Sequence, residues 1–180
     1  MQALAALWVF VWAHLFPTWG DMVGSFRTSR NCTSFNQGKV PEWGAATPGA
    51  AHLCQRFHNS YHFTTLYDTH HRVAVYSAYR FQTSNGGGRE KRWFVEPQAY
   101  ILVGALPSAS NWIVKNVNIP EYLWNAYCCL DNNGTSCAGA TALNTEQNWV
   151  GRYTIADLMA FLRQYANSPV GELFFNNSEA

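Results

Sequence analysis

The stretch that decides the fold is residues 61–81, YHFTTLYDTHHRVAVYSAYRF, because it joins two strand-like runs through a polar turn. Residues 61–66 and 73–81 are dense in β-branched and aromatic side chains, which are typical of strands, and residues 68–71 (DTHH) are typical of a turn. These features predict a β-hairpin. Alternation along the second run separates two faces, of which we expect the first to belong in the core. The first face holds Val73, Val75, Tyr79 and Phe81, and the second holds Tyr76 and Arg80.

Three further stretches extend the predicted sheet. Residues 99–106 (AYILVGAL) form an unbroken apolar run of strand length, which predicts a central strand covered on both faces. Residues 122–130 and 137–143 flank the sequence DNNG at 131–134, whose Asn-Gly pair favours a tight turn, so we expect a second hairpin there. Residues 172–175 (ELFF) predict a short final strand.

One helix is predicted near the C-terminus. Thr154 can cap its first backbone N–H groups, and Asp157 three residues later completes a box-like start. Apolar residues then recur at helical spacing and predict one buried stripe. These are Ile155, Leu158, Met159, Leu162 and Tyr165. Residues 167–169 (NSP) end the helix, and the Gly-, Pro- and Ser-rich residues 25–48 predict an irregular segment. The predicted fold class is α+β, a mostly antiparallel sheet with a C-terminal helix.

The composition bounds the class of protein. The chain has 180 residues, of which 48% are hydrophobic and only 13% charged. It therefore has enough apolar residues to form the core of one folded domain, and its composition is not that of a disordered chain. Twelve Lys and Arg against eleven Asp and Glu give a net charge of +1. No global field therefore attracts nucleic acid or anionic lipid, and any such binding must come from a local patch.

The N-terminus predicts secretion. Residues 1–20 carry no Asp, Glu, Lys or Arg, and their apolar run is short and ends at Pro17, which favours a signal peptide cleaved near Gly20 over a buried helix. The mature domain then spans residues 21–180. Glycosylation sequons lie at Asn31, Asn133 and Asn176. Five cysteines, at 32, 54, 128, 129 and 137, leave at least one unpaired or paired between chains.

Two groups of residues could carry chemistry. Cys54, His58 and His62 would align as zinc ligands on a helix, but the sequence around them favours strand or turn, so no metal site is expected. Asp68 and His70, with His71 beside them, hold the minimum for general base catalysis, although a solvated turn in which Asp68 binds its own backbone is the stronger interpretation. Neither a nucleophile elbow nor a phosphate loop is present in the sequence.

One basic loop predicts contact with nucleic acid. Arg89, Lys91 and Arg92 can neutralise phosphates, and Trp93 beside them can stack on a base. Arg72, in the first hairpin, is a further candidate. A solvated surface loop is the alternative interpretation of this charge run.

Several segments together resemble the endonuclease domain-containing 1 protein family. They are residues 54–57 (CQRF), 64–69 (TTLYDT), 75–79 (VYSAY), 93, 96–98 (EPQ), 111–115 (NWIVK), 120–129 (PEYLWNAYCC) and 170–174 (VGELF). The resemblance extends over residues 25–178. It implies a secreted branch of the DNA/RNA non-specific endonucleases, which cleave phosphodiesters with Mg²⁺ held in a ββα finger.

The resemblance also implies a loss of activity. The family's catalytic Asp-Arg-Gly-His motif is absent, and Gln98 runs directly into Ala99 where the family has the finger segment. We therefore expect no hydrolysis and no bound Mg²⁺, and we expect residual nucleic acid binding at most. Loss of the segment would expose apolar sheet surface, through which the chain could dimerise. A non-enzymatic secreted binding module and a non-functional splice product are the alternatives.

Overall fold

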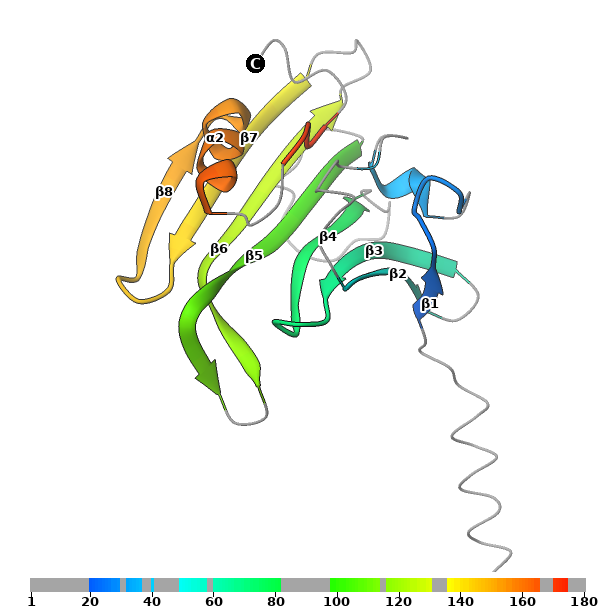
Figure 1. Cartoon of the computed structure of the whole chain (residues 1–180). Coiled ribbons are helices and arrows are strands. Elements are labelled where there is room, and N and C mark those ends of the chain that lie inside the picture. Colours follow the sequence, from blue (N-terminus) through cyan, green and yellow to red (C-terminus); the bar gives the residue numbers. More distant parts are fainter. Residues whose placement is uncertain are drawn as a thin grey trace, which may run out of the picture.

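The computed structural model describes residues 20–29, 32–36, 40, 49–57, 60–81, 98–113, 116–130, 136–165 and 170–174. These residues form an antiparallel sheet and one α-helix (Figure 1). The strands are β1 (Gly20–Val23), β2 (Ala50–Phe57), β3 (Ser60–Asp68), β4 (Val73–Phe81), β5 (Gln98–Ile113), β6 (Val117–Leu130), β7 (Ser136–Asn144) and β8 (Trp149–Tyr153). The helices are the 3-10 helix η1 (Thr33–Asn36) and the α-helix α2 (Ile155–Tyr165). The predicted α+β class is confirmed.

Within the described residues, the sheet is a meander of eight strands in which each strand pairs with the next along the chain. Both predicted hairpins are confirmed, since β3 pairs with β4 and β6 pairs with β7, all antiparallel. The central strand β5 is twice as long as the predicted run because it continues to Ile113 and pairs there with the start of β6. It is covered only in part on its second face, where Val103 is 37% exposed.

The hydrophobic core lies on one face of this sheet. By the strand register, Tyr76, Leu102, Trp124 and Ala142 point to the same side. They form one buried cluster with Leu158 and Leu162 of α2 and with Phe26 and Cys32 of the N-terminal segment. In Figure 1 the helix and the N-terminal segment lie on the same side of the sheet, at its two ends. Burying these apolar side chains is the main stabilising contribution to the fold.

The face of β4 that we predicted to be in the core is confirmed at Val75, which is buried in the core cluster beside a shift in the β3–β4 register, and is wrong at the far end of the strand. Tyr76 is 1% exposed and Ala78 is fully buried, whereas Phe81 of the predicted face is 38% exposed. Both faces of this strand are apolar, so alternation alone does not say which one the rest of the chain covers. The irregular segment and η1 pack over the Tyr76 face, and that contact decides the outcome.

The helix begins as predicted. The Thr154 hydroxyl accepts a hydrogen bond from the Asp157 backbone N–H at 3.1 Å and donates one to the Asp157 carboxylate at 2.7 Å. The four aliphatic members of the predicted stripe are buried. Tyr165 is 43% exposed instead, and its ring packs on Tyr122 and Phe161 at the rim.

The predicted final strand is absent from the described part of the C-terminus, residues 170–174. Val170 forms a single bridge, and residues 171–174 are not in a strand. Leu173 and Phe174 are nevertheless buried, so the apolar run serves packing and not sheet pairing. Phe175 lies outside the described residues.

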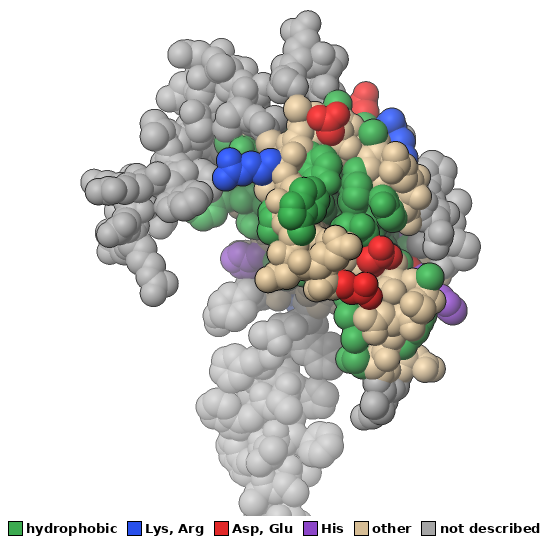
Figure 2. Space-filling view, turned by 90° about the vertical axis from the view of Figure 1, so that its left-hand side faces the viewer, with side chains coloured by type: hydrophobic (Ala, Val, Ile, Leu, Met, Phe, Trp, Pro, Cys, Tyr) green, Lys and Arg blue, Asp and Glu red, His purple; other side chains and the backbone are tan. Residues whose placement is uncertain are grey.

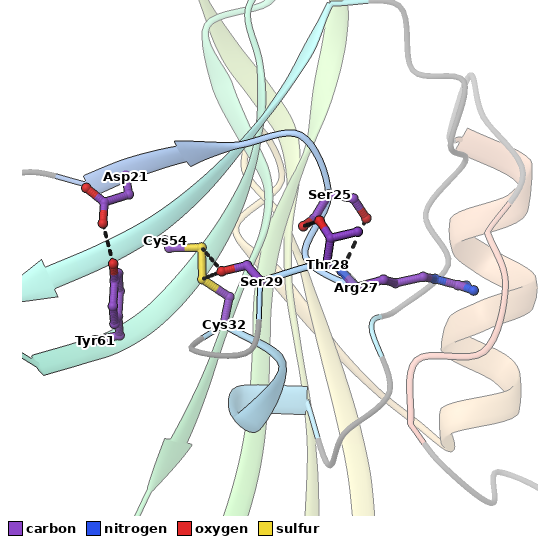
Figure 3. Close-up of a disulfide and its surroundings, with 8 residues drawn as sticks. All are labelled: Asp21, Ser25, Arg27, Thr28, Ser29, Cys32, Cys54 and Tyr61. Carbon is purple, nitrogen blue, oxygen red and sulfur yellow. Dashed lines mark hydrogen bonds between the residues drawn. A yellow bond between two sulfur atoms is a disulfide. The ribbon is translucent and has the colours of Figure 1, made fainter.

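The irregular N-terminal segment is attached to the sheet by a disulfide between Cys32 and Cys54, with Cα atoms 5.9 Å apart (Figure 3). The Ser29 hydroxyl lies 3.5 Å from the Cys32 sulfur. On β1, the Asp21 carboxylate accepts a hydrogen bond from the Tyr61 hydroxyl of β3. Since Cys54 is in a strand and in a disulfide, the helical zinc alignment with His62 does not form. His58 lies outside the described residues.

Hydrophobic side chains are exposed where the sheet ends at β8. Trp149 and Val150 are each 57% exposed. Figure 2 looks onto this end, with β8 and α2 toward the viewer, and shows hydrophobic side chains gathered there between acidic ones. Among the described residues, no helix has the length and apolarity needed to cross a bilayer.

Candidate functional site

The β3–β4 turn is shaped by Asp68. Its Oδ1 accepts hydrogen bonds from the backbone N–H groups of His70 at 2.8 Å and His71 at 3.0 Å. This is the Asx arrangement that lets an aspartate close a turn on itself. The turn ends at Arg72, whose φ of 56° lies in the left-handed region. The stronger of our two interpretations of Asp68, a turn in which it binds its own backbone, is thus what the structure shows.

The second carboxylate oxygen of Asp68 binds a histidine ring. Oδ2 lies 2.6 Å from Nδ1 of His71, and the side chains of His71 and Asp68 are 21% and 9% exposed. Burial raises the pKa of Asp68, but hydrogen bonds from the backbone and ring of His71 and from the backbone of His70 outweigh it, so the pKa lies below its ordinary value. Asp68 is therefore ionised at neutral pH and accepts the Nδ1–H of His71.

The sequence paired Asp68 with His70, whereas the structure pairs it with His71. In a tight turn, neighbouring side chains diverge, and the third residue after the aspartate comes back over its carboxylate. The ring of His70 instead makes an edge-on contact with that of His71, at 4.8 Å between centroids. Any general base in this turn would accordingly be His71, oriented by Asp68.

Trp112 completes the site from a distant part of the chain. Its ring is stacked on that of His71, with centroids 5.6 Å apart and planes 22° apart, and it meets His70 edge-on at 6.3 Å. Trp112 is 38% exposed, and His70 is exposed as well. We name Asp68, His70, His71 and Trp112 the tip cluster.

A buried asparagine holds the two hairpins of the tip cluster together. The Asn118 backbone N–H donates to the carbonyl oxygen of His71 at 3.0 Å. Its side chain accepts from the N–H of Ser108 at 2.8 Å and donates to the Ser108 carbonyl at 2.7 Å. Asn118 is 3% exposed, so these bonds are shielded from water. They fix the irregular part of the β5–β6 pairing beside the β3–β4 turn.

The tip cluster does not fit a divalent metal. Both oxygens of Asp68 already accept hydrogen bonds, and Mg²⁺ prefers several free carboxylate or carbonyl oxygens. Among the residues that the structure describes, no group of three or more His, Cys, Asp or Glu is placed to hold a metal ion. The exposed rings and the adjacent Arg72 are suited to stacking and to anion contact instead.

Most of the nucleic-acid residues predicted from the sequence fall outside the described ranges. These are Arg89, Lys91, Arg92 and Trp93, and the glycosylation candidates Asn31, Asn133 and Asn176 fall outside as well, as do residues 1–19. Arg72 is described and exposed, next to His71. Sequence reasoning missed Trp112 because nothing local links it to residues some 40 positions earlier; its only signal was its place in the NWIVK segment.

Two curated relatives match part of the chain. Endonuclease domain-containing 1 protein of Homo sapiens is 42% identical over 67 residues, which make up 37% of this chain and 13% of the human protein. The protein of the same name from Mus musculus is 39% identical over 67 residues, with the same shares. No family model and no solved structure matches the chain.

The similarity is therefore partial. It covers 67 residues rather than the whole of residues 25–178 that the separate motifs indicated, and the aligned part spans about an eighth of each relative.

The state of the cysteines indicates the compartment in which the chain folds. Cys32 and Cys54 form a disulfide and Cys129 is disulfide-bonded too, while Cys128 is a buried thiol. Disulfides are typical of proteins that fold in an oxidising compartment.

Proposed function

We propose that this chain is a secreted relative of endonuclease domain-containing 1 protein that binds single-stranded nucleic acid without cleaving it. The observation that carries the proposal is the tip cluster, where two exposed rings, His70 and Trp112, are in contact, and the exposed Arg72 follows the same turn in the chain. Rings that stack on bases and a cation that contacts phosphate are the usual parts of a single-strand site. The partial similarity to an endonuclease-named protein supports nucleic acid as the ligand.

The absence of cleavage is argued from residue chemistry. The chain has no Asp-Arg-Gly-His sequence, which the resemblance would require for the catalytic base. A positioned base contributes roughly 10² to 10⁴-fold in rate, and a metal stabilises charge on the phosphate in addition. The Asp68 carboxylate, with both oxygens engaged, is not a substitute ligand for that metal. The loop with Arg89, Lys91, Arg92 and Trp93 would add further phosphate and base contacts.

Binding is measured by fluorescence anisotropy with labelled single strands of about 12 nucleotides, a length within the range of known single-strand sites. The assay uses the purified secreted chain after its cooperative melting has been verified. We expect Trp112→Ala to weaken binding about tenfold, the order of one lost base stack. Trp149→Ala is the matched control, because Trp149 is also exposed but lies on β8. Equal affinity of the two variants, or no binding by the folded wild type, would overturn the proposal.

The contribution of Arg72 is separated by salt. Arg72→Gln removes one cation, so the slope of log affinity against log salt becomes shallower by about 0.7, the value for one single-strand phosphate contact. Gln keeps a polar side chain at this left-handed position, which limits the change to charge. An unchanged slope would remove Arg72 from the site.

A second candidate function rests on the Asp68–His71 hydrogen bond. A carboxylate that orients an imidazole is the arrangement of a general base, and it requires no metal. Degradation of labelled RNA and DNA is followed with Mg²⁺ and with chelator. Our proposal predicts no degradation in either. Degradation that persists in chelator and is lost in His71→Gln would establish this second function instead.

A further inference from the structure

The sheet has a second face, opposite to α2 and the core, which we name the open face. The strand register places on it residues from every strand. Its large apolar members include Met22, Leu53, Phe63, Tyr79, Ile101, Val103, Leu123, Tyr127, Leu143 and Val150. Several are strongly exposed: Met22 is 76% exposed, Leu123 43% and Tyr127 40%. A sheet face in contact with water is normally polar, whereas this face has rows of apolar side chains on both sides of one largely polar row.

The open face carries almost no charge. Its polar side chains that the register pairs are neutral, namely Gln55, Thr65, Ser77, Asn125 and Thr141, and the one charged side chain among these paired positions is Arg152. Arg152 lies on β8, at the margin of the sheet. This face therefore offers no group of charged side chains to which an oppositely charged partner could bind. A second apolar sheet face opposes it without burying an unpaired charge.

The open face also has the size of an interface. Strands are spaced about 4.8 Å apart, so the distance from β2 to β8 is roughly 30 Å, and six residues along a strand add about 20 Å. In projection this is about 600 Å², close to the ~800 Å² that each partner buries in a standard interface.

We infer that the open face is the contact surface of a homodimer in which two copies pack sheet on sheet. A second copy of the chain is a suitable partner because it presents the same face, which is largely uncharged. A two-fold axis near Val103 and Asn125 would place both Arg152 side chains at the rim of the interface. Face-to-face sheets pack about 10 Å apart with their strands within about 30° of each other, as in a β-sandwich. The inference is independent of the nucleic acid proposal, because the tip cluster is not part of this face.

Sedimentation velocity of the secreted chain over a wide concentration range tests the dimer. We expect a monomer–dimer equilibrium in the wild type, with the dimer lost in Val103→Glu and in Leu123→Glu, at least a hundredfold weaker in each. Both positions are more than a third exposed in the single chain, so the monomer tolerates the charge. Ala160→Glu on the exposed side of α2 is the matched control and retains the dimer. A wild type that remains monomeric throughout, or a dimer unaffected by both face variants, overturns the inference.

A labelling experiment on the wild type keeps the test valid if a variant misfolds. Hydroxyl-radical oxidation is compared at low and high protein concentration. Phe63 and Tyr127 are expected to become protected at high concentration, while Trp149, which the register places on the opposite face, remains equally reactive. Protection of Trp149 alone, or of neither set, would contradict a face-to-face dimer. Binding of the monomer to phosphatidylcholine vesicles with loss of the same reactivity would identify a lipid occupant and would also overturn it.

Discussion

At Gly104, in the centre of the sheet, the neighbouring residues leave no room for a side chain. A Cβ there would lie against the carbonyl oxygen of Val75 and the ring of Trp124, closer than van der Waals contact allows. We expect Gly104→Ala to lower the free energy of unfolding by about 2 kcal/mol, as overpacked cores do. Urea denaturation measures this. Gly24→Ala, where no atom lies within 4 Å of the added Cβ, is the control and changes stability little.

A second single residue, Asp68, makes the stability of the folded chain depend on pH. Its pKa is lower in the folded chain than in the unfolded chain, so its contribution is present above about pH 4 and is lost as the pH falls through the folded value. Asp68→Asn keeps an oxygen for the turn and loses the carboxylate. Its melting temperature should lie below that of the wild type at pH 7, and the two should converge near pH 2. A gap of the same size at both pH values would show that the ionised carboxylate contributes nothing.

The buried face of β4 shows what a residue pattern can and cannot predict. Alternation correctly separates Tyr76 from Phe81, because the side-chain period of a strand is two. Which set is buried depends on where residues 24–29 and 32–36 pack, and that information lies outside the strand. A meander with two apolar faces therefore leaves the choice open until a covering segment is placed.

At the scale of elements, the start of α2 is the most local feature of the fold. The Thr154–Asp157 box supplies partners for N–H groups that the helix itself leaves unsatisfied. We expect Thr154→Ala to destabilise the protein by about 1 kcal/mol and Thr154→Ser to be nearly neutral, because Ser keeps the hydroxyl. Thermal melting followed by circular dichroism distinguishes the two. Equal losses would assign the effect to the methyl group of Thr154 rather than to the cap.

The elements that were predicted correctly are those with a local signal: a cap, a turn sequence or an apolar run. The strands β1, β2 and β8 carry weak sequence signals and exist because a neighbouring strand offers them a hydrogen-bonding edge. The apolar residues 173–174 show the reverse case, since their composition is typical of a strand but they are buried by packing without joining the sheet.

At the scale of the molecule, the Cys32–Cys54 disulfide attaches the N-terminal segment to the core. It spans 22 residues of sequence, and closing a loop of that order stabilises a protein by about 3 kcal/mol. The double variant Cys32→Ala/Cys54→Ala should lose this amount in chemical denaturation. Cys128→Ala replaces another buried cysteine and keeps the disulfide, so it should lose clearly less. Equal losses would mean that packing at Cys32 and Cys54, not the bond, stabilises the segment.

The tip cluster also belongs to this scale. The sequence indicated Asp68 and its neighbouring histidines, but not which of them the carboxylate would bind, and it did not associate them with Trp112. Their meeting depends on the long β5–β6 hairpin reaching past the β3–β4 turn, and on Asn118 joining the two. Contacts of this kind are a property of the assembled sheet.

The order of strands has a consequence for how the protein is made. Because each strand pairs with the one just before it, the sheet can grow in step with synthesis, and no strand must wait for a distant partner. The helix α2, which covers the Trp124 side, follows all of these strands in the chain, so it leaves the ribosome after them. A nascent chain halted before residue 154 would hold a finished sheet with its α2 covering still missing. The time needed to synthesise α2 after β8 thus sets an interval during which the apolar face of the sheet depends on chaperones.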